Sequence, residues 1–329
     1  MKFRTKIEIA AMDFRVKYEN NLLFVGSCFS DHIAQRLNAL NYKVFNNPFG
    51  TLYNPASIQQ SLALLFSDHI FKASDLFQHE GLWSSFLHHS DFSRISPEES
   101  LQVMNDTLMQ ARMKLMGMDH LFITFGTAWT FIHKETNEVV ANCHRLPAAH
   151  FTRKRMTVED IVERYDILIR KLKKINPGLK IIFTISPVRY LKDGFHENQL
   201  SKAILQLAVE ALYKQHSGVY YFPAYEILND DLRDYRFYDN DLVHPSQEAV
   251  QYVFENFESV FLEPSEQHIR KVSRALHTAR MHKVRYSGTE QYQKFIRTQL
   301  DKINHLQSIC PILELVELRN FFSSQLKHK

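Results

Sequence analysis

Short apolar runs that end in glycine or serine alternate with amphipathic stretches along the first 260 residues, and this alternation restricts the fold most. The clearest runs are 22–26, 120–126 and 180–186. Runs of this length and composition are typical of strands that are buried on both faces. Because strands that alternate with helices form mainly parallel sheets, we expect an α/β domain with helices on both faces of the sheet.

The segments between these runs complete the predicted order. We expect further strands at 42–45 and 219–222, and a hairpin of 129–133 with 138–142 around the turn 135–137. The helices that we expect are 31–40 with Ser30 as N-cap, 55–67, 97–116, 157–174 with Thr157 as N-cap, 198–215 and 246–257.

The pattern changes after residue 262, where strand signals cease. Residues 264–307 predict one or two charged amphipathic helices, and 309–325 predict another. We therefore expect two parts, a domain over 1–262 and a helical C-terminal extension over 263–329.

Composition excludes several classes of protein. Hydrophobic residues at 45% and charged residues at 23% are ordinary for a soluble globular chain. A net charge of +4 does not indicate a nucleic-acid binder, and we interpret the basic stretch 270–297 as a solvated helix face. No signal-peptide pattern and no run of about 18 apolar residues is seen, so we expect a cytoplasmic protein without membrane contact.

Three cysteines, Cys28, Cys143 and Cys310, lie far apart in the chain. Without a C-x-x-C pair, neither a common structural zinc site nor a disulfide framework is expected. A metal site made of Cys143, His144 and His244 has no recognised ligand spacing, so we expect no metal and no cofactor.

The tract Gly26-Ser27-Cys28 follows the first strand and enters the first helix. Backbone N–H groups at a helix start favour negative charge, both on a thiolate and on a developing oxyanion. We therefore expect Cys28 to have a lowered pKa and to be a competent nucleophile.

A second tract, Asp241-Leu242-Val243-His244, follows the last strand. A spacing of three places both ionisable side chains on one side of a helical turn. His244 can then act as the base toward a nucleophile while Asp241 orients it, with Asp239 as a less favoured alternative.

These tracts carry a resemblance to the GSCFA family, a branch of the SGNH/GDSL hydrolase superfamily. The tract Gly26-Ser27-Cys28-Phe29 is followed by Ser30 where the family name has alanine. The resemblance covers roughly 1–260, and its further tracts occur in order at 47–50, 53–55, 125–129, 142–144, 186–189 and 241–246.

The resemblance implies a three-layer α/β/α domain of the SGNH-hydrolase, or flavodoxin-like, type. It places Cys28 at the nucleophile position, Gly50 and Gly126 at glycine positions of the second and third blocks, and Asp241 with His244 in the last block. Two departures stand out: a thiol replaces the usual hydroxyl, and Ala128 stands where an oxyanion-binding asparagine is expected. Ser27 as nucleophile stays open, as does replacement of the missing donor by Asn54 or Asn142.

Other candidates lie near the same strand ends. His144 is a second acid/base candidate, Arg145 and Arg189 are candidates for binding an anion, and ordinary polar contacts explain each equally well. We interpret His88 and His89 as surface loop residues.

The leading hypothesis is an ester hydrolase or O-acyltransferase that acts on a small-molecule or carbohydrate ester. The alternatives are a catalytically inactive SGNH-like module that binds a ligand, and an interaction protein that works through its C-terminal helices. The oligomeric state does not follow from the sequence.

Overall fold

The computed structural model describes residues 4–282, 286 and 288–326. Its contacts divide the chain into two compact units, which are described separately. The first unit contains residues 1–9, 21–34 and 45–255, and the second contains 10–20, 35–44 and 256–329.

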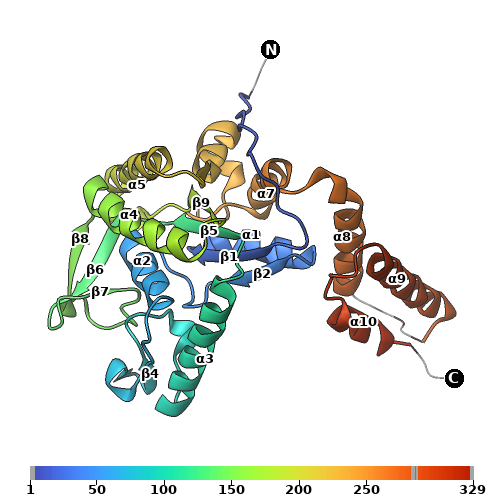
Figure 1. Cartoon of the computed structure of the whole chain (residues 1–329), viewed down its shortest axis with the longest axis horizontal. Helices are drawn as coiled ribbons and strands as arrows, with labels where there is room; N and C mark the ends of the chain where they lie inside the picture. The colour runs from blue at the N-terminus through green and yellow to red at the C-terminus, as the bar shows by residue number, and fades with distance from the viewer. Residues whose placement is uncertain (1–3, 283–285, 287, 327–329) are drawn as a thin grey trace. The chain divides into compact units, whose positions relative to one another are not determined.

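The α/β part of the chain contains a five-stranded sheet (Figure 1) with the strand order β10-β9-β5-β1-β2. The pairs β1–β5, β5–β9 and β9–β10 are parallel, and Gly26 lies opposite Thr124 in the β1–β5 register. When these five strands are numbered in the order in which they occur along the chain, the order across the sheet is 2-1-3-4-5, as in flavodoxin-like folds. The strands are β1 (Asn21–Gly26), β2 (Lys43–Asn46), β5 (His120–Phe125), β9 (Lys180–Ile185) and β10 (Val219–Phe222).

Both faces of the sheet are buried. On one face, alternate strand residues such as Val25, Ile123 and Phe183 share a core with four helices, which are α2 (Pro55–Leu64), α3 (Pro97–Leu115), α4 (Val158–Ile175) and α5 (Phe195–Gln215). The residues of the other face, including Phe24 and Phe122, are also buried, and these two rings stack at 4.4 Å. This arrangement confirms the predicted three-layer α/β/α fold with a mainly parallel sheet.

Most of the helices lie close to their predicted positions. The capping box of Thr157 and Asp160 begins α4, and Asn54 caps α2. The described helices are α1 (Cys28–Ala39), α2 (Pro55–Leu64), α3 (Pro97–Leu115), α4 (Val158–Ile175), α5 (Phe195–Gln215), α6 (Ala224–Glu226), α7 (Gln247–Phe261), α8 (Gln267–Met281), α9 (Glu290–Ile309) and α10 (Val316–Ser323), with a π-helix at Ile227–Leu232.

Two small antiparallel sheets stand beside the central one. The predicted hairpin is present as β6 (Trp129–His133) and β7 (Val139–Val140), and β8 (Phe151–Arg155) adds an unpredicted third strand to it. The other sheet pairs β3 (Phe77–His79) with β4 (Leu82–Ser84) and was also not predicted.

The second unit contains the C-terminal helices, which confirms the predicted helical character of this region. Its basic stretch departs from our interpretation at Arg270, because this side chain is buried rather than solvated. The guanidinium of Arg270 donates to the Glu263 carbonyl at 2.7 Å and lies 3.8 Å from the Glu258 carboxylate. Residues 283–285 and 287 of the stretch lie outside the described residues.

Within the described residues, no helix combines the length and the apolar character that a bilayer crossing needs.

Candidate active site

The turn between β1 and α1 is tighter than predicted. Helix α1 begins at Cys28 rather than at Asp31, because the Ser30 N–H donates to the Ser27 carbonyl at 2.8 Å. Gly26 has φ +146°, and its N–H donates to the Asn47 side-chain oxygen at 2.8 Å. Cys28 is therefore the first residue of the helix and lies just beyond the carboxyl end of β1.

The environment of the Cys28 thiol contradicts one expectation. Burial raises its pKa above the ordinary value, and the nearby Asp31 carboxylate raises it further. The N–H groups of Phe29 and Cys28, together with the Lys202 ammonium, lower the pKa but do not reverse the shift. The helix start thus favours the thiolate, as predicted, but desolvation outweighs it and the expected lowered pKa is wrong.

Asp31 organises the loop that follows β2. One carboxylate oxygen accepts from the side-chain amides of Asn46 and Asn47, each at 2.6 Å, and the other accepts from the Thr51 hydroxyl at 3.2 Å. These bonds fix the loop against the start of α1.

Gly50 and Gly126 lie close to this turn, but their N–H groups are engaged. Gly50, with φ +75°, donates to the Asn47 carbonyl at 2.8 Å, and a Cβ added to it would lie 2.3 Å from the Cβ of His89. Gly126 donates to the Tyr53 carbonyl at 2.7 Å. Both glycines therefore allow close backbone packing, and neither presents its N–H to a ligand in this structure.

The side-chain oxygens of the two asparagines that were considered as replacement donors accept local hydrogen bonds. The Asn54 side-chain oxygen accepts from the Ser57 N–H at 2.8 Å and so caps α2. The Asn142 side-chain oxygen accepts from the His144 N–H at 2.8 Å. Ala128 is fully buried, and its N–H donates to the Ser201 hydroxyl at 2.8 Å.

Asp241 and His244 form the predicted pair, in a loop rather than in a regular helical turn. The Asp241 carboxylate accepts from His244 Nδ1 at 2.6 Å and from the backbone N–H groups of Val243 and His244 at 2.8 and 2.9 Å. These bonds lower the pKa of Asp241 to about 2. Arg189 holds the loop in place, since its backbone N–H donates to the Val243 carbonyl and its guanidinium to the Leu242 carbonyl, both at 3.1 Å.

The titration of Asp241 gives a first testable prediction. Its folded pKa lies below its unfolded value, so its stabilising contribution is present above about pH 4 and is lost as the pH falls toward 2. The NMR chemical shifts of the His244 ring depend on whether the neighbouring Asp241 carboxylate is ionised. We expect these shifts to stay constant between pH 5 and 4 and to change as the pH falls toward 2. Asp241→Asn is expected to remove this low-pH transition; a transition that persists in the variant would contradict the assignment.

No hydrogen bond of the described chain joins His244 to Cys28 or to Ser27. The Ser27 hydroxyl is 1% exposed and has no hydrogen-bond partner among the described residues. The charged side chains that shift the pKa of the Cys28 thiol are instead Asp31 and Lys202. Burial raises the pKa of Tyr53 and of Tyr190, and the charge of Cys28 raises both further. Neither Tyr190 nor Lys202 was a candidate from the sequence, and Tyr53 appeared only within the tract 53–55 of the family resemblance.

His144 and Arg145 serve local structure. The His144 ring contacts the Ser85 carbonyl through Nε2 at 2.9 Å and packs edge-on against Phe77 at 5.4 Å. Arg145 is exposed and lies 4.0 Å from the Glu80 carboxylate. In the described part of the chain, no group of three or more His, Cys, Asp and Glu side chains has a metal-binding arrangement.

The interpretation of His88 as a surface residue is wrong. His88 is 1% exposed, and its ring lies 4.7 to 5.6 Å from the rings of Phe49, Phe71 and Phe92. Burial lowers its pKa to about 3. His89 is half-buried and pairs with the Asp91 carboxylate at 3.0 Å.

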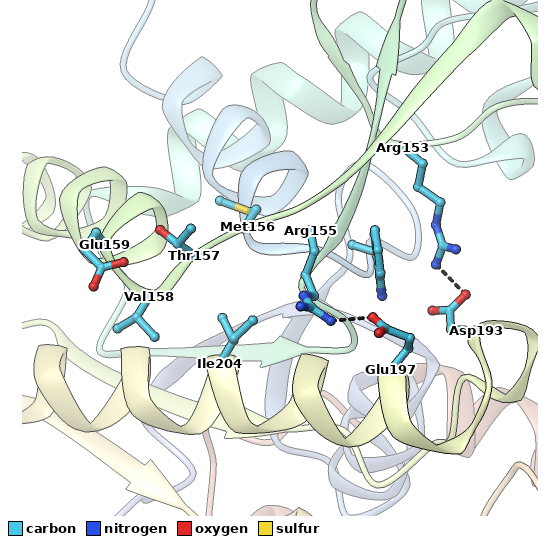
Figure 2. Close-up of a pocket in the computed structure, with 10 residues that line it drawn as sticks. Arg153, Arg155, Met156, Thr157, Val158, Glu159, Asp193, Glu197 and Ile204 are labelled. Carbon is cyan, nitrogen blue, oxygen red and sulfur yellow. Dashed lines mark hydrogen bonds and ion pairs between the residues drawn. The ribbon is translucent and has the colours of Figure 1, made fainter.

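A pocket of about 750 Å³ lies outside the predicted site (Figure 2), between β8 and α5. Figure 2 shows Arg153 directed toward Asp193 and Arg155 toward Glu197, and each makes an ion pair. The Arg153 guanidinium also stacks over the Trp129 ring at 4.2 Å. The two arginines that line the pocket are therefore each paired with a carboxylate.

A smaller recess of about 200 Å³ adjoins the Asp241–His244 loop. Arg189, which holds that loop, also lines the recess together with Tyr225, Tyr235 and Tyr238. Its guanidinium lies 5.2 Å from the ring centre of Tyr238. The recess is thus lined by aromatic rings and hydrogen-bonding side chains.

Comparison with known families gives a match over the segments that carry this candidate site. The model described as GSCFA family matches residues 21–257, which include both tracts of the site. The chain belongs to the GSCFA family. A second model, described as GSCFA domain protein, C-terminal domain, matches residues 274–328. The second model therefore matches the helical C-terminal segment, which lies beyond the short tracts that carried the resemblance in the sequence.

Solved structures similar to this GSCFA chain include three esterases. An acetyl xylan esterase (Est2A) from Butyrivibrio proteoclasticus is 11% identical, with a TM-score of 0.39, over 74% of this chain and 64% of that one, just under two thirds. A family two carbohydrate esterase from Clostridium thermocellum in complex with cellohexaose is 12% identical, with a TM-score of 0.37, over 76% of this chain and 65% of that one. A family 3 carbohydrate esterase from Talaromyces cellulolyticus is 8% identical, with a TM-score of 0.35, over 77% of this chain and 99% of that one.

Similarities this low carry no information on function, so the function of this GSCFA chain has to be inferred from its own site residues. No curated protein matches the sequence.

Proposed function

We propose that this chain hydrolyses an ester with Cys28 as the nucleophile, His244 as the general base and acid, and Asp241 as the residue that orients His244. The observation that carries the proposal is the position of Cys28 at the start of α1, where the N–H groups of Phe29 and Cys28 act to lower the pKa of the thiol. A helix start beyond a parallel strand is where a thiolate and an oxyanion are both stabilised.

Cys28 is favoured over Ser27 because of exposure and contacts. Cys28 is half-buried at the start of α1, whereas Ser27 is 1% exposed and its hydroxyl has no hydrogen-bond partner in the described chain. A nucleophile must reach its substrate, so the Ser27 hydroxyl is the poorer candidate.

In the proposed reaction, the Cys28 thiol gives its proton to His244 and its sulfur bonds to the acyl carbon. The bond to the leaving alcohol breaks, and His244 returns the proton to that oxygen. Water then attacks the thioester, gives a proton to His244, and releases the carboxylic acid and the thiol. If another alcohol replaces water, the same steps give O-acyl transfer.

The proposal requires His244 to come within hydrogen-bond reach of Cys28, a contact that often tightens only when substrate is bound. It also assigns the oxyanion to the N–H groups at the start of α1, because the Gly50 and Gly126 N–H groups are engaged elsewhere. The tyrosine-lined recess beside the Asp241–His244 loop supports a polyhydroxylated leaving group, as in a carbohydrate ester. A cytoplasmic location stays a prediction from the sequence.

Turnover and labelling together test this function. Hydrolysis of p-nitrophenyl acetate and of an acetylated xylo-oligosaccharide is expected to fall by at least about 100-fold in Cys28→Ala and His244→Ala, and to stay within about threefold in Ser27→Ala. An adduct located by mass spectrometry after substrate trapping is expected on Cys28.

Cys143 provides the internal reference for labelling, since it is half-buried and burial raises its pKa to about 11. Labelling of Cys28 by iodoacetamide that is no faster than that of Cys143, is unchanged by His244→Ala, and is accompanied by no turnover would contradict the enzyme and favour a ligand-binding module. An adduct of a fluorophosphonate on Ser27 would instead assign the nucleophile to Ser27.

A further inference from the structure

The recess beside the Asp241–His244 loop contains a cation without an acidic partner. Arg189 lies in the segment after β9 and lines this recess of about 200 Å³. Its guanidinium donates to the Leu242 carbonyl at 3.1 Å, and no ion pair of the described chain includes it. Since a guanidinium has several further N–H donors, Arg189 keeps both its charge and most of its hydrogen-bonding capacity for a ligand.

The other charged side chains that line the recess are already paired. Arg233 lies 3.7 Å from the Asp230 carboxylate, and the Asp234 carboxylate accepts from the Arg236 guanidinium at 2.8 Å. Among the described residues that line the recess, Arg189 therefore carries the charge that is not balanced.

Three aromatic rings surround the Arg189 guanidinium. The ring centres of Phe195, Tyr235 and Tyr238 lie 5.4, 5.6 and 5.2 Å from its Cζ. The rings and the hydrogen bond to Leu242 restrict the side chain before any ligand arrives, which reduces the entropy that binding costs.

Two hydroxyls in the walls of the recess are engaged within the protein. The Tyr225 hydroxyl donates to the Gln199 side-chain oxygen at 3.0 Å, and the Tyr238 hydroxyl lies 3.5 Å from the Asn229 side-chain oxygen. Because charge-assisted hydrogen bonds are the strong ones, the Arg189 guanidinium is the strongest donor that the recess offers. This arrangement favours an anionic ligand over a neutral one.

We propose that this recess binds a carboxylate of the substrate through Arg189, so that the ester cleaved is that of an acidic sugar such as a uronic acid. The proposal rests on the proposed function and names its substrate class. A guanidinium holds a carboxylate by two parallel hydrogen bonds, and aromatic walls with a few polar groups suit a sugar-sized ligand. The Arg189 N–H also donates to the Val243 carbonyl at 3.1 Å, so the bound sugar lies beside the loop that carries His244.

The test compares two ligands that contain no ester, methyl glucuronoside and methyl glucoside, which differ only in the carboxylate at C6. NMR titration of the full chain at pH 7 and low salt is expected to give a Kd below about 5 mM for the glucuronoside, at least about tenfold tighter than for the glucoside. Affinities within about twofold of each other, or no binding of the glucuronoside up to about 20 mM, would overturn the proposal.

A variant of Arg189 assigns the preference to this side chain. Arg189→Gln keeps a donor for the Leu242 carbonyl and removes the charge, so its affinity for the glucuronoside should fall at least about tenfold while that for the glucoside stays within about twofold. Lys192→Gln is the matched control, because Lys192 is an exposed cation close by in the sequence that does not line the recess. An equal loss in both variants would indicate long-range attraction and contradict the recess.

A second measurement covers the case in which Arg189→Gln does not fold. In the wild-type protein, the glucuronoside is expected to shift the ring resonances of Tyr235 and Tyr238, which line the recess. Binding that leaves both rings unshifted would overturn the proposal.

These ligands are not hydrolysed, so the result is separate from that of the proposed function. Selective binding of the glucuronoside without turnover of any ester would support the recess and contradict the esterase. Hydrolysis of esters without a preference for the glucuronoside would support the esterase and contradict the acidic substrate.

Discussion

Gly26→Ala is expected to destabilise the protein by at least about 3 kcal/mol, because both the backbone and the space at this position exclude a side chain. The residue has φ +146°, and an added Cβ would lie 2.3 Å from the Thr124 carbonyl oxygen on the neighbouring strand. Neither the added Cβ nor the Thr124 carbonyl can move away without breaking the β1–β5 pairing. Urea denaturation followed by circular dichroism measures the loss, which is a large part of the stability of an ordinary domain.

Two other glycines separate the causes. Gly81 has φ +78° with no atom within 4 Å of an added Cβ, so Gly81→Ala tests backbone strain alone and should cost about 1 kcal/mol. Gly117 has open space and no positive φ, so Gly117→Ala should be neutral within about 0.5 kcal/mol. If Gly26→Ala cost no more than Gly81→Ala, the close approach of the two strands would be wrong.

Acid is expected to begin to destabilise the protein through His88 near pH 6.5, above the range in which carboxylates titrate. The folded pKa of about 3 lies below the unfolded value of 6.5, so the unfolded chain binds the proton first. The contribution of neutral His88 is fully present above pH 6.5 and decreases as the pH falls toward 3. At pH 4.5 this single group should have lowered the free energy of unfolding by roughly 3 kcal/mol.

His88→Phe is expected to remove this part of the pH dependence. The ring fits among Phe49, Phe71 and Phe92, and both nitrogens of His88 lack a partner in the described chain, so stability at pH 7 should be equal or higher. Urea titrations at pH 7.0, 5.5 and 4.5 measure the slope. His120, whose pKa is also lowered by burial, to about 4, should leave a residual slope of similar size over this pH range. Exposed His277, changed to Phe, is the control, and equal slopes in wild type and His88→Phe would refute the assignment.

The central sheet followed from the sequence because each of its long strands is an apolar run buried on both faces. The strand 219–222 has the predicted bounds, and Thr157 begins its helix as predicted. The strand β8 was not predicted because its sequence, Phe-Thr-Arg-Lys-Arg, has neither alternation nor an apolar run. It forms because its arginines stack on Trp129 and pair with acidic residues of distant segments, and such contacts are not visible in a local window.

The site was predicted as far as short tracts allow. The Asp241–His244 pair depends on three neighbouring residues, and local spacing is enough to predict it. The balance of forces on Cys28 is different, because it depends on burial and on Asp31 and Lys202, which only the folded chain brings together. His88 and Lys202 show the same limit: a polar residue type predicts exposure, and burial overrides it where surrounding packing leaves no water.

The second unit joins chain segments from opposite ends of the sequence. The Val16 N–H donates to the Phe261 carbonyl, and the Tyr18 N–H donates to the Glu266 carboxylate across a separation of 248 residues. During synthesis, the segment 10–20 therefore leaves the ribosome long before its partners exist, and this unit can close only when the last helices have been made. A prematurely terminated chain would keep an unpaired N-terminal segment with exposed Val16 and Tyr18, which is the kind of apolar surface that chaperones and proteases recognise.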